Sequence, residues 1–435
     1  MIKRSFFGLV KPKLQYEIID EAPAEPISIN ASKQITLLID QFPDTAGNDL
    51  FKTGDEVKRG QKIAMADDVP AYLLSSQSGQ ISKISEFVGM LGKKFTAVTI
   101  DVKPDAKTDT KSDAARAVDE GFKNACQTPS LDNAAKFLAG LPGKPDFSVF
   151  SDPEKPVKAI VVCGLDDDLL TTTNQYVVKN NIFAIKTGID LICKISGISH
   201  AIMVVPQHLE QVAGSSGAIV KTVDSEYPSA HPELIMQHIL ASDDGKSMSE
   251  SGIAFFSAEA VSAIGAAYNT GIPPLEKIVT VVTKDGNKRL VSVPIGTPLQ
   301  DILSEFNETL NEGDRVIFGG PMTGTSVFST DYPVLPDTDT IIIQDKSQIT
   351  ERDDIACINC GECVRVCPAN IQINQLIRFL EAGQYEEAAD QWDLFSCIEC
   401  GFCSYVCESR IPIFQHIKLA KHTLESMKAA EESNA

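Results

Sequence analysis

The chain has 435 residues, of which 43% are hydrophobic and 23% charged, so it can form about two to four globular domains. Its formal charge of -20 argues against a nucleic-acid or anionic-lipid surface, because phosphate contacts need clustered Lys and Arg. The acidity favours solubility and is compatible with docking of a basic redox partner. The first ten residues contain two cations but only a short apolar run, so we expect no signal peptide and no export.

Residues 40–100 alternate short apolar runs with glycine-containing turns, which predicts a module of short β-strands. This pattern resembles the barrel-sandwich hybrid fold of lipoyl and biotinyl carrier domains. A carrier would present a modifiable lysine at a hairpin tip, and residues 71–79 contain none. We therefore expect a structural β module here.

The middle of the chain predicts an α/β domain. Residues 104–119 are rich in Lys, Asp, Thr and Ala, which is typical of a linker at a domain boundary. Residues 157–240 then alternate apolar strands, at 157–163 and 201–205, with helical stretches such as 232–241. The nearly apolar segment 251–268 is interrupted by polar side chains, so we expect one amphipathic buried helix and no membrane span.

Residues 277–345 predict a further compact unit in which strand, turn and helix follow closely. It begins with a strand at 278–283 and contains Gly319-Gly320-Pro321-Met322. The unit resembles the β-grasp module known as SLBB. We assign it no chemistry.

Eight of the eleven cysteines lie between Cys357 and Cys407, in two runs that each follow C-x2-C-x2-C-x3-C. This is the spacing of bacterial ferredoxins, in which three cysteines of a run and the fourth of the other run bind one 4Fe-4S cluster. The sequence thus predicts two 4Fe-4S clusters. The first set of ligands is Cys357, Cys360, Cys363 and Cys407, and the second is Cys367, Cys397, Cys400 and Cys403.

The alternative for these cysteines is a pair of four-cysteine zinc sites, which also use C-x2-C pairs. Zinc does not require a third and a fourth cysteine at this spacing in both runs, so the iron-sulfur interpretation is favoured. Glu408 stands where the second run would usually carry proline. Between the runs, apolar residues at helical spacing predict two amphipathic helices, at about 373–380 and 385–392.

The order of these modules resembles the RnfC family, subunits of the Rnf ion-translocating oxidoreductase complexes, over nearly the whole chain. The motifs that carry the resemblance are the cysteine runs, with residues 395–401 and 404–407, and the segments 293–298 and 319–324. The resemblance implies a multidomain α+β chain: a barrel-sandwich hybrid at 1–103, a Rossmann-like α/β domain at 104–275, an SLBB domain at 276–348 and a helical dicluster ferredoxin domain at 349–435. It also implies a peripheral subunit on the cytoplasmic face of the membrane, and FMN and NADH in the α/β domain.

The family's glycine-rich flavin loop corresponds to residues 121–129, where Lys123, Asn124 and Cys126 replace glycines. Glycines let backbone N–H groups approach a phosphate, so these side chains predict a degenerate FMN site around Gly121 and Lys123. The family's acidic segment corresponds to 163–169, which gives Asp166 and Asp168 as further candidates. A third stretch, at 227–232, also lacks the family's glycines.

We therefore expect an iron-sulfur electron-transfer subunit of a membrane-associated Rnf-type complex, with membrane and redox subunits as partners. The alternative is an enzyme in its own right, in which FMN takes hydride from NADH and passes single electrons to the clusters. A cobalamin-reductase role is a third interpretation, because such relatives carry the same modules in another order.

Overall fold

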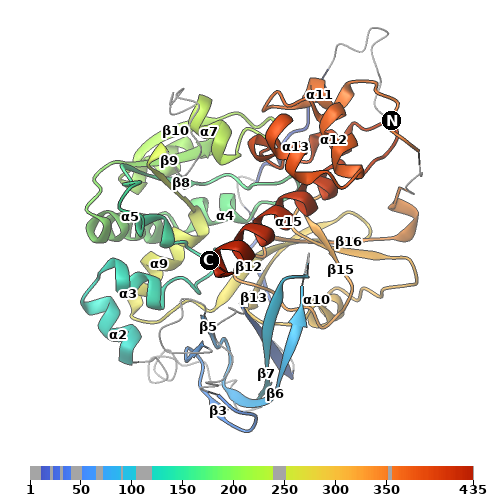
Figure 1. Ribbon diagram of the computed structural model, residues 1–435. Coiled ribbons are helices and arrows are strands. Elements are labelled where there is room, and N and C mark those ends of the chain that lie inside the picture. The colour runs from blue at the N-terminus through green and yellow to red at the C-terminus, as the bar shows by residue number, and fades with distance from the viewer. Residues whose placement is uncertain are drawn as a thin grey trace.

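The computed structural model describes residues 11–19, 23–29, 33–40, 51–64, 72–89, 92–103, 120–238, 251–350 and 355–434. Two expectations lie outside these residues, namely the missing signal peptide and the linker at 104–119. Within them the chain forms two β-rich units, one parallel α/β unit and one helical C-terminal unit (Figure 1).

The first β unit lies at the lower edge of Figure 1. Four strands form an antiparallel sheet in the order β2 (Gln34–Asp40), β7 (Lys94–Val102), β6 (Gly79–Val88) and β3 (Glu56–Val57). A separate pair consists of β4 (Lys62–Ala64) and β5 (Tyr72–Leu74). Alternate residues of β2, such as Ile35, Leu37 and Ile39, are fully buried, as the period of two in a strand requires.

The segment that precedes β2 does not join this sheet. The Tyr16 backbone N–H donates to the Ser225 carbonyl, and Ile19 N–H donates to the Gln175 side chain. Further along, β1 (Ile27–Ser28) pairs in parallel with β13 (Lys288–Pro294). Residues 11–19 and 23–29 therefore attach to the two central units, because backbone groups of both segments find partners there.

The α/β unit contains a four-stranded parallel sheet in the order β10, β9, β8 and β11. Alternate side chains of β8 and β9 face opposite layers. One layer contains the long helices, and the other contains α7 and part of the C-terminal unit. The elements are β8 (Ala159–Cys163), β9 (Ala201–Pro206), β10 (Ile219–Val223), β11 (Ile253–Ser257), α4 (Thr173–Asn180), α5 (Ile182–Ser196), α6 (Glu210–Ala213), α7 (Pro232–His238) and α9 (Ala258–Thr270).

The expectation of one helix over residues 251–268 is wrong. The segment forms strand β11, which pairs in parallel with β8, and only then helix α9. The change occurs at Ser257, whose backbone is extended and whose side chain accepts a hydrogen bond from Ala260 N–H as an N-cap. A short apolar run beside a helix does not reveal this division, because a buried strand and a buried helix are both apolar.

Two short helices, α2 (Glu120–Gln127) and α3 (Leu131–Phe137), precede the parallel sheet. They pack against the same layer as α5 and α9, with Phe122, Ala134 and Leu138 buried. In the stretch 121–129, expected to correspond to the family's flavin loop, residues 121–127 are helical.

The second β unit is a six-stranded mixed sheet in the order β1, β13, β12, β16, β14 and β15. Lys277 of β12 is fully buried and forms ion pairs with Glu259 of α9 and, at 2.5 Å, with Asp339. This buried network joins the α/β unit to the sheet. The remaining elements are β12 (Glu276–Val282), β14 (Arg315–Phe318), β15 (Thr325–Val327), β16 (Thr340–Gln344) and α10 (Leu299–Glu305).

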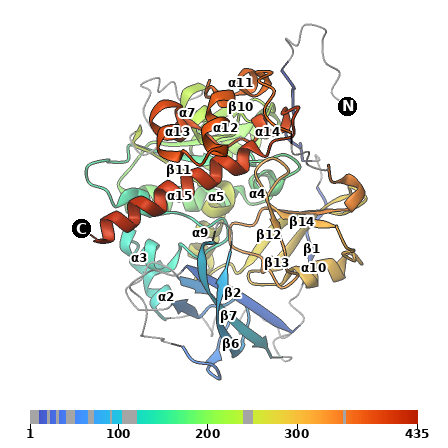
Figure 2. The ribbon, with the colours of Figure 1, turned by 45° about the vertical axis from the view of Figure 1, so that its right-hand side comes forward.

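The C-terminal helices, orange to red in Figures 1 and 2, gather beside the α/β unit, and α15 runs back across the body. The helix predicted at about 373–380 is α12, in which Ile373, Leu376, Ile377 and Leu380 are buried. The helices are α11 (Glu362–Val366), α12 (Ile373–Glu381), α13 (Tyr385–Gln391), α14 (Phe402–Tyr405) and α15 (Ile413–Asn434). Among the described residues, no helix combines the length and apolar character needed to cross a membrane.

Candidate metal centre

The two cysteine runs adopt the same backbone conformation, 40 residues apart. Asn359 and Glu399 take the left-handed conformation, with φ of 57° and 58°, and Gly361 and Gly401 follow with φ of 77° and 74°. Each glycine then begins a short helix, α11 or α14. This tight turn directs successive cysteines to one side of the loop, so the runs build two equivalent sites.

The structure brings the eight cysteines together in two groups of four. One cavity is lined by Cys357, Cys360 and Cys363 with Cys407 from the other run. The other is lined by Cys397, Cys400 and Cys403 with Cys367 from the first run. These are the same two sets that the ferredoxin spacing predicts. We call the first cavity the outer site and the second the inner site.

The lining of both sites suits sulfur ligation. Besides the cysteines, the inner cavity is lined mainly by apolar side chains, and the outer cavity by four isoleucines together with four polar residues. Glu399 N–H donates to Cys397 Sγ and Ile411 N–H donates to Cys407 Sγ, each at 3.4 Å, and such bonds tune the potential of a cluster. In the described parts of the chain, no three His, Cys, Asp or Glu side chains converge on a single-ion position.

Burial raises the pKa of the Cys363 thiol to about 11 and that of the Cys400 thiol to about 12. A buried thiol without a metal therefore keeps its proton at neutral pH. A bound metal reverses this preference, because its positive charge stabilises the thiolate. Two sets of four soft sulfur donors in an apolar setting fit iron-sulfur clusters.

The inner site is held by the body of the protein. The Tyr227 hydroxyl donates to the Cys400 carbonyl at 2.7 Å, and its ring lies 5.5 Å from that of Phe402 in an edge-on arrangement. Gly401 contacts the Met322 carbonyl so closely that a Cβ there would lie 2.5 Å from the oxygen. The inner loop is thus clamped between the α/β unit and the six-stranded sheet.

A cation also contacts the inner loop. The Lys421 ammonium of α15 donates to the Cys397 carbonyl at 2.7 Å and pairs with Glu399 at 2.9 Å. The outer loop has neutral partners at comparable places, where the Ser409 hydroxyl donates to the Ala356 carbonyl and Asn374 donates to the Asn359 side chain. Neither Tyr227 nor Lys421 was identified from the sequence. The sequence contains one hint of Lys421. The two runs are 40 residues apart, and the position equivalent to Lys421 after the first run is the acidic Glu381.

The four residues expected at a flavin site lie on different segments and make different contacts. Gly121 and Lys123 lie on α2, which touches α9 near its end, where the Cys126 thiol faces the Ala267 carbonyl. Asp166 accepts from Asn174 N–H at 2.7 Å, and Asn174 in turn accepts from Glu259 N–H at the start of α9. Through Cys126 and Asn174, α2 and Asp166 are thus linked to residues of α9 that are roughly 12 Å apart along its axis.

The Asp168 carboxylate is bonded to another part of the chain. Its carboxylate accepts from the N–H and the hydroxyl of Thr323, both at 2.7 Å, and from Met322 N–H at 3.1 Å. A Cβ on Gly320 would lie 2.1 Å from its carboxyl carbon. Burial raises the pKa of Asp168 and raises that of Asp166 to about 7. Asp166 and Asp168 are thus both engaged by other parts of the chain.

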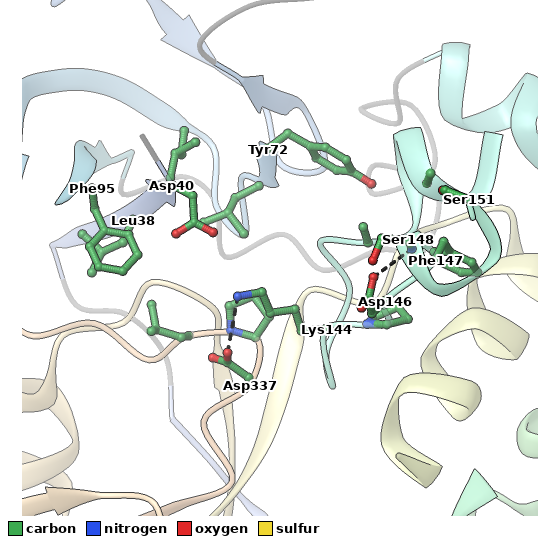
Figure 3. Close-up of a pocket in the computed structure, with 17 residues that line it drawn as sticks. Leu38, Asp40, Tyr72, Phe95, Lys144, Asp146, Phe147, Ser148, Ser151 and Asp337 are labelled. Atoms are coloured by element: carbon green, nitrogen blue, oxygen red, sulfur yellow. Dashed lines mark hydrogen bonds and ion pairs between the residues drawn. The ribbon is translucent and has the colours of Figure 1, made fainter. Parts of the chain in front are cut away.

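A larger cavity lies elsewhere and contains none of the predicted site residues. It measures about 550 Å³ and is bounded by the first β unit, by the segment after α3 and by the turn at 335–337 (Figure 3). Lys144 and Asp337 form an ion pair there at 3.5 Å, and Tyr72 and Phe147 line its wall. The cavity is mainly apolar.

Comparisons with known proteins agree with this architecture. Residues 5–107 match the family model of the RnfC barrel sandwich hybrid domain, and residues 349–408 match that of the 4Fe-4S dicluster domain. The chain is 23% identical over 353 residues to the C subunit of the Na+-translocating ferredoxin:NAD+ oxidoreductase complex of Acetobacterium woodii, covering 78% of this chain and 79% of the relative. It is 24% identical over 416 residues to the C subunit of the proton-translocating ferredoxin:NAD+ oxidoreductase complex of Clostridium ljungdahlii, covering 90% and 88%.

Among solved structures, an NAD+-reducing [NiFe]-hydrogenase in the H2-reduced state is similar with a TM-score of 0.42 and 14% identity, covering 70% of this chain and 63% of that chain. The fold and the cysteine cavities define an iron-sulfur protein of the 4Fe-4S type with a ferredoxin-like C-terminal domain. The chain is similar over most of its length to RnfC proteins, the C subunits of Rnf-type oxidoreductase complexes.

Proposed function

We propose that this chain is the iron-sulfur electron-transfer subunit of a membrane-associated Rnf-type complex and that it holds two 4Fe-4S clusters. The observation that carries the proposal is the division of eight cysteines into two cavities, each with one cysteine from the opposite run. This division is the cross-ligation of two-cluster ferredoxins. A 4Fe-4S cluster supplies one-electron chemistry, and the two adjacent sites give a short path between donor and acceptor.

Each cavity has its own ligand set in this proposal. Cys357, Cys360, Cys363 and Cys407 hold the outer cluster, and Cys367, Cys397, Cys400 and Cys403 hold the inner one. All four sulfur positions of each site are used, so no open coordination position remains for a substrate. The chain then relays electrons and does not itself transform a substrate at the metal.

The remaining units serve as a scaffold in this proposal. Their bounds are 1–103 for the barrel-sandwich hybrid, 104–275 for a Rossmann-like α/β domain, 276–348 for an SLBB domain and 349–435 for the cluster domain. The parallel sheet, with α5 and α9 on one face and α7 on the other, supports the second assignment, and the compact mixed sheet around α10 supports the third. The Asp168 contact with residues 322–323 ties these two domains together.

The partners in this proposal are the membrane and redox subunits of an Rnf-like complex, with the chain peripheral on the cytoplasmic face. The names of the relatives from Acetobacterium woodii and Clostridium ljungdahlii support it, since both proteins are subunits of ion-translocating complexes. Co-purification with the products of neighbouring genes from solubilised membranes tests this assignment. Recovery of the chain only from the soluble fraction, without partners, would count against it.

Anaerobically purified protein should contain about eight iron and eight sulfide per chain, four of each per cluster. The pairing is tested by electron paramagnetic resonance of dithionite-reduced serine variants. Cys407→Ser and Cys360→Ser should alter the same signal, and Cys367→Ser and Cys400→Ser the other, while Cys193→Ser serves as a control outside both sites. Stoichiometric zinc in place of iron would end the electron-transfer proposal, whereas a different pairing would change only the ligand assignment.

The alternative function, NADH oxidation by FMN in the α/β domain, finds less support. Asp166 accepts a hydrogen bond from Asn174 N–H, and the Asp168 carboxylate is engaged by residues 322–323, whereas the other two candidates lie on the separate helix α2. Flavin analysis of the anaerobic protein decides between the two functions. Stoichiometric FMN together with bleaching of the clusters by NADH would favour the alternative.

A further inference from the structure

The two cysteine loops have the same backbone but opposite surroundings. Ile398 and Cys400 of the inner loop are 9% and 7% exposed, because the body of the protein covers them. Their counterparts 40 residues earlier are Ile358, which is 63% exposed, and Cys360, which is also exposed. Since the local conformations match, the difference comes from tertiary packing alone.

The residues packed on the inner loop show which contacts a cysteine loop of this shape can make. An aromatic hydroxyl donates to the carbonyl of the central cysteine, from Tyr227 to Cys400, and a main-chain carbonyl rests on the glycine that follows. Ile398 inserts into an apolar cluster that includes Tyr227 and Phe402. In the outer loop the matching isoleucine, cysteine and glycine present the same shape to the outside.

The outer loop also has a composition that favours an interface. Ile355 is 50% exposed and stands three residues before Ile358, and between them Cys357 is only half-buried. Single exposed apolar residues are ordinary, but two within five residues of an exposed cysteine add apolar surface beside the candidate metal centre. Glu408, which lines the same cavity and is exposed, adds negative charge to a chain whose formal charge is already -20.

We propose that the face formed by Ile355, Ile358 and Cys360, the outer-loop face, docks a second redox protein and exchanges electrons with it. This inference rests on the proposed function. The partner is a one-electron redox protein with a basic rim around an apolar patch and with its own redox centre close beneath that patch. The basic rim complements the acidic chain, and the apolar patch covers Ile358 as the body covers Ile398.

One electron leaves the reduced chain at this face and reduces the partner's oxidised centre, with no bond formed or broken. The outer site lies beside the surface and the inner site lies against the body, so exchange with an external protein takes place at the outer site. The inner site faces the interior, toward Tyr227 and Met322.

The test measures oxidation of the dithionite-reduced full chain by cytochrome c, a basic one-electron protein, in stopped flow. Ile358→Lys should lower the second-order rate about tenfold, because it repels a basic partner and places a charge in the apolar contact. The matched control is Phe395→Lys, which makes the same charge change at another exposed apolar residue, 54% exposed, before the inner loop. Its rate should stay within about twofold of the wild-type rate at a salt concentration that screens distant charges.

Three further measurements distinguish a failure of the proposed function from a failure of the docking proposal. They are iron content, the resonance spectra and oxidation by ferricyanide, which needs no docked protein. If the wild-type chain holds no iron, the proposed function fails. If the clusters are intact but Ile358→Lys reacts with cytochrome c as fast as the wild type, or Phe395→Lys slows the reaction equally, the outer-loop face is not the docking site. Ile358→Ser changes no charge, should lower the rate about threefold through the lost apolar contact, and replaces the lysine variant if that variant loses iron.

Discussion

The Tyr227 hydroxyl donates a hydrogen bond to the carbonyl of Cys400, across 173 residues of sequence. Both groups are buried, so the bond fixes the position of the inner cysteine loop against the α/β unit. Replacement of Tyr227 by Phe removes the donor and leaves the carbonyl without it, which should cost about 1–3 kcal/mol of local stability. The inner site should therefore lose iron to a chelator faster than in the wild type.

The measurement for Tyr227→Phe is the rate of iron loss under anaerobic conditions, with resonance spectra to show which cluster decays first. Tyr405→Phe provides the control, because Tyr405 is 44% exposed on α14. Faster loss from the outer cluster, or equal loss in both variants, would contradict the role of this hydrogen bond.

Lys421 should raise the reduction potential of the inner site. Its ammonium contacts the Cys397 carbonyl and is only 14% exposed, so its charge is poorly screened by water. Lys421→Gln removes this charge, leaves Glu399 without its cation and makes addition of an electron less favourable. We expect the potential of the inner cluster to fall by roughly 60 mV, a tenfold change in a one-electron equilibrium.

A redox titration followed by resonance spectroscopy measures the effect of Lys421→Gln. Lys428→Gln removes the same charge from an exposed position two turns further along α15 and should leave both potentials nearly unchanged. Equal shifts for the two variants would show that the effect is one of total charge.

Gly320 and Asp168 form a close contact between the α/β unit and the six-stranded sheet. A methyl group at position 320 would lie 2.1 Å from the Asp168 carboxyl carbon, so Gly320→Ala must displace the bonds to residues 322–323. We expect a loss of roughly 1–3 kcal/mol, visible as a lower midpoint of thermal unfolding. Gly214→Ala, where a methyl group meets nothing within 4 Å, should change the midpoint little and provides the control.

Asp166 should make the stability of the chain pH-dependent. Burial raises its pKa from 3.8 to about 7, so the folded chain keeps a proton that the unfolded chain releases between these values. The contribution of this group is full below about pH 4 and is lost as the pH rises to about 7, by roughly 1.4 kcal/mol per pH unit at most. Asp166→Asn cannot ionise and should remove this part of the slope.

Thermal unfolding midpoints at about pH 5 and about pH 7 measure this prediction for the wild type and the variant. Asp166→Asn also changes the hydrogen bond from Gln175, but that effect is an offset that does not vary with pH. Parallel slopes for the two proteins would show that Asp166 is already ionised in the folded state.

The spacing of the cysteines was enough to predict which four share a cavity. Within each run the ligand positions depend on a few consecutive residues, and the left-handed conformations of Asn359, Gly361, Glu399 and Gly401 give both loops the same shape. The helix α12 was also predictable, because its amphipathic pattern depends only on neighbouring residues. By contrast, the division of residues 251–268 into β11 and α9 depended on pairing with β8, which the local pattern does not encode.

The amino-acid sequence by itself determined three cysteines of each set, because covalent spacing and turn conformation place them within one loop, and the ferredoxin pattern assigned the fourth from the other run. Only the tertiary structure decided that the loop of Cys400 is buried while that of Cys360 is exposed. It also decided that Asp168 binds a distant turn while Lys123 lies on a separate helix. The reason is physical: burial and hydrogen-bond partners come from segments far apart in the chain, and local patterns carry no record of which segments will meet.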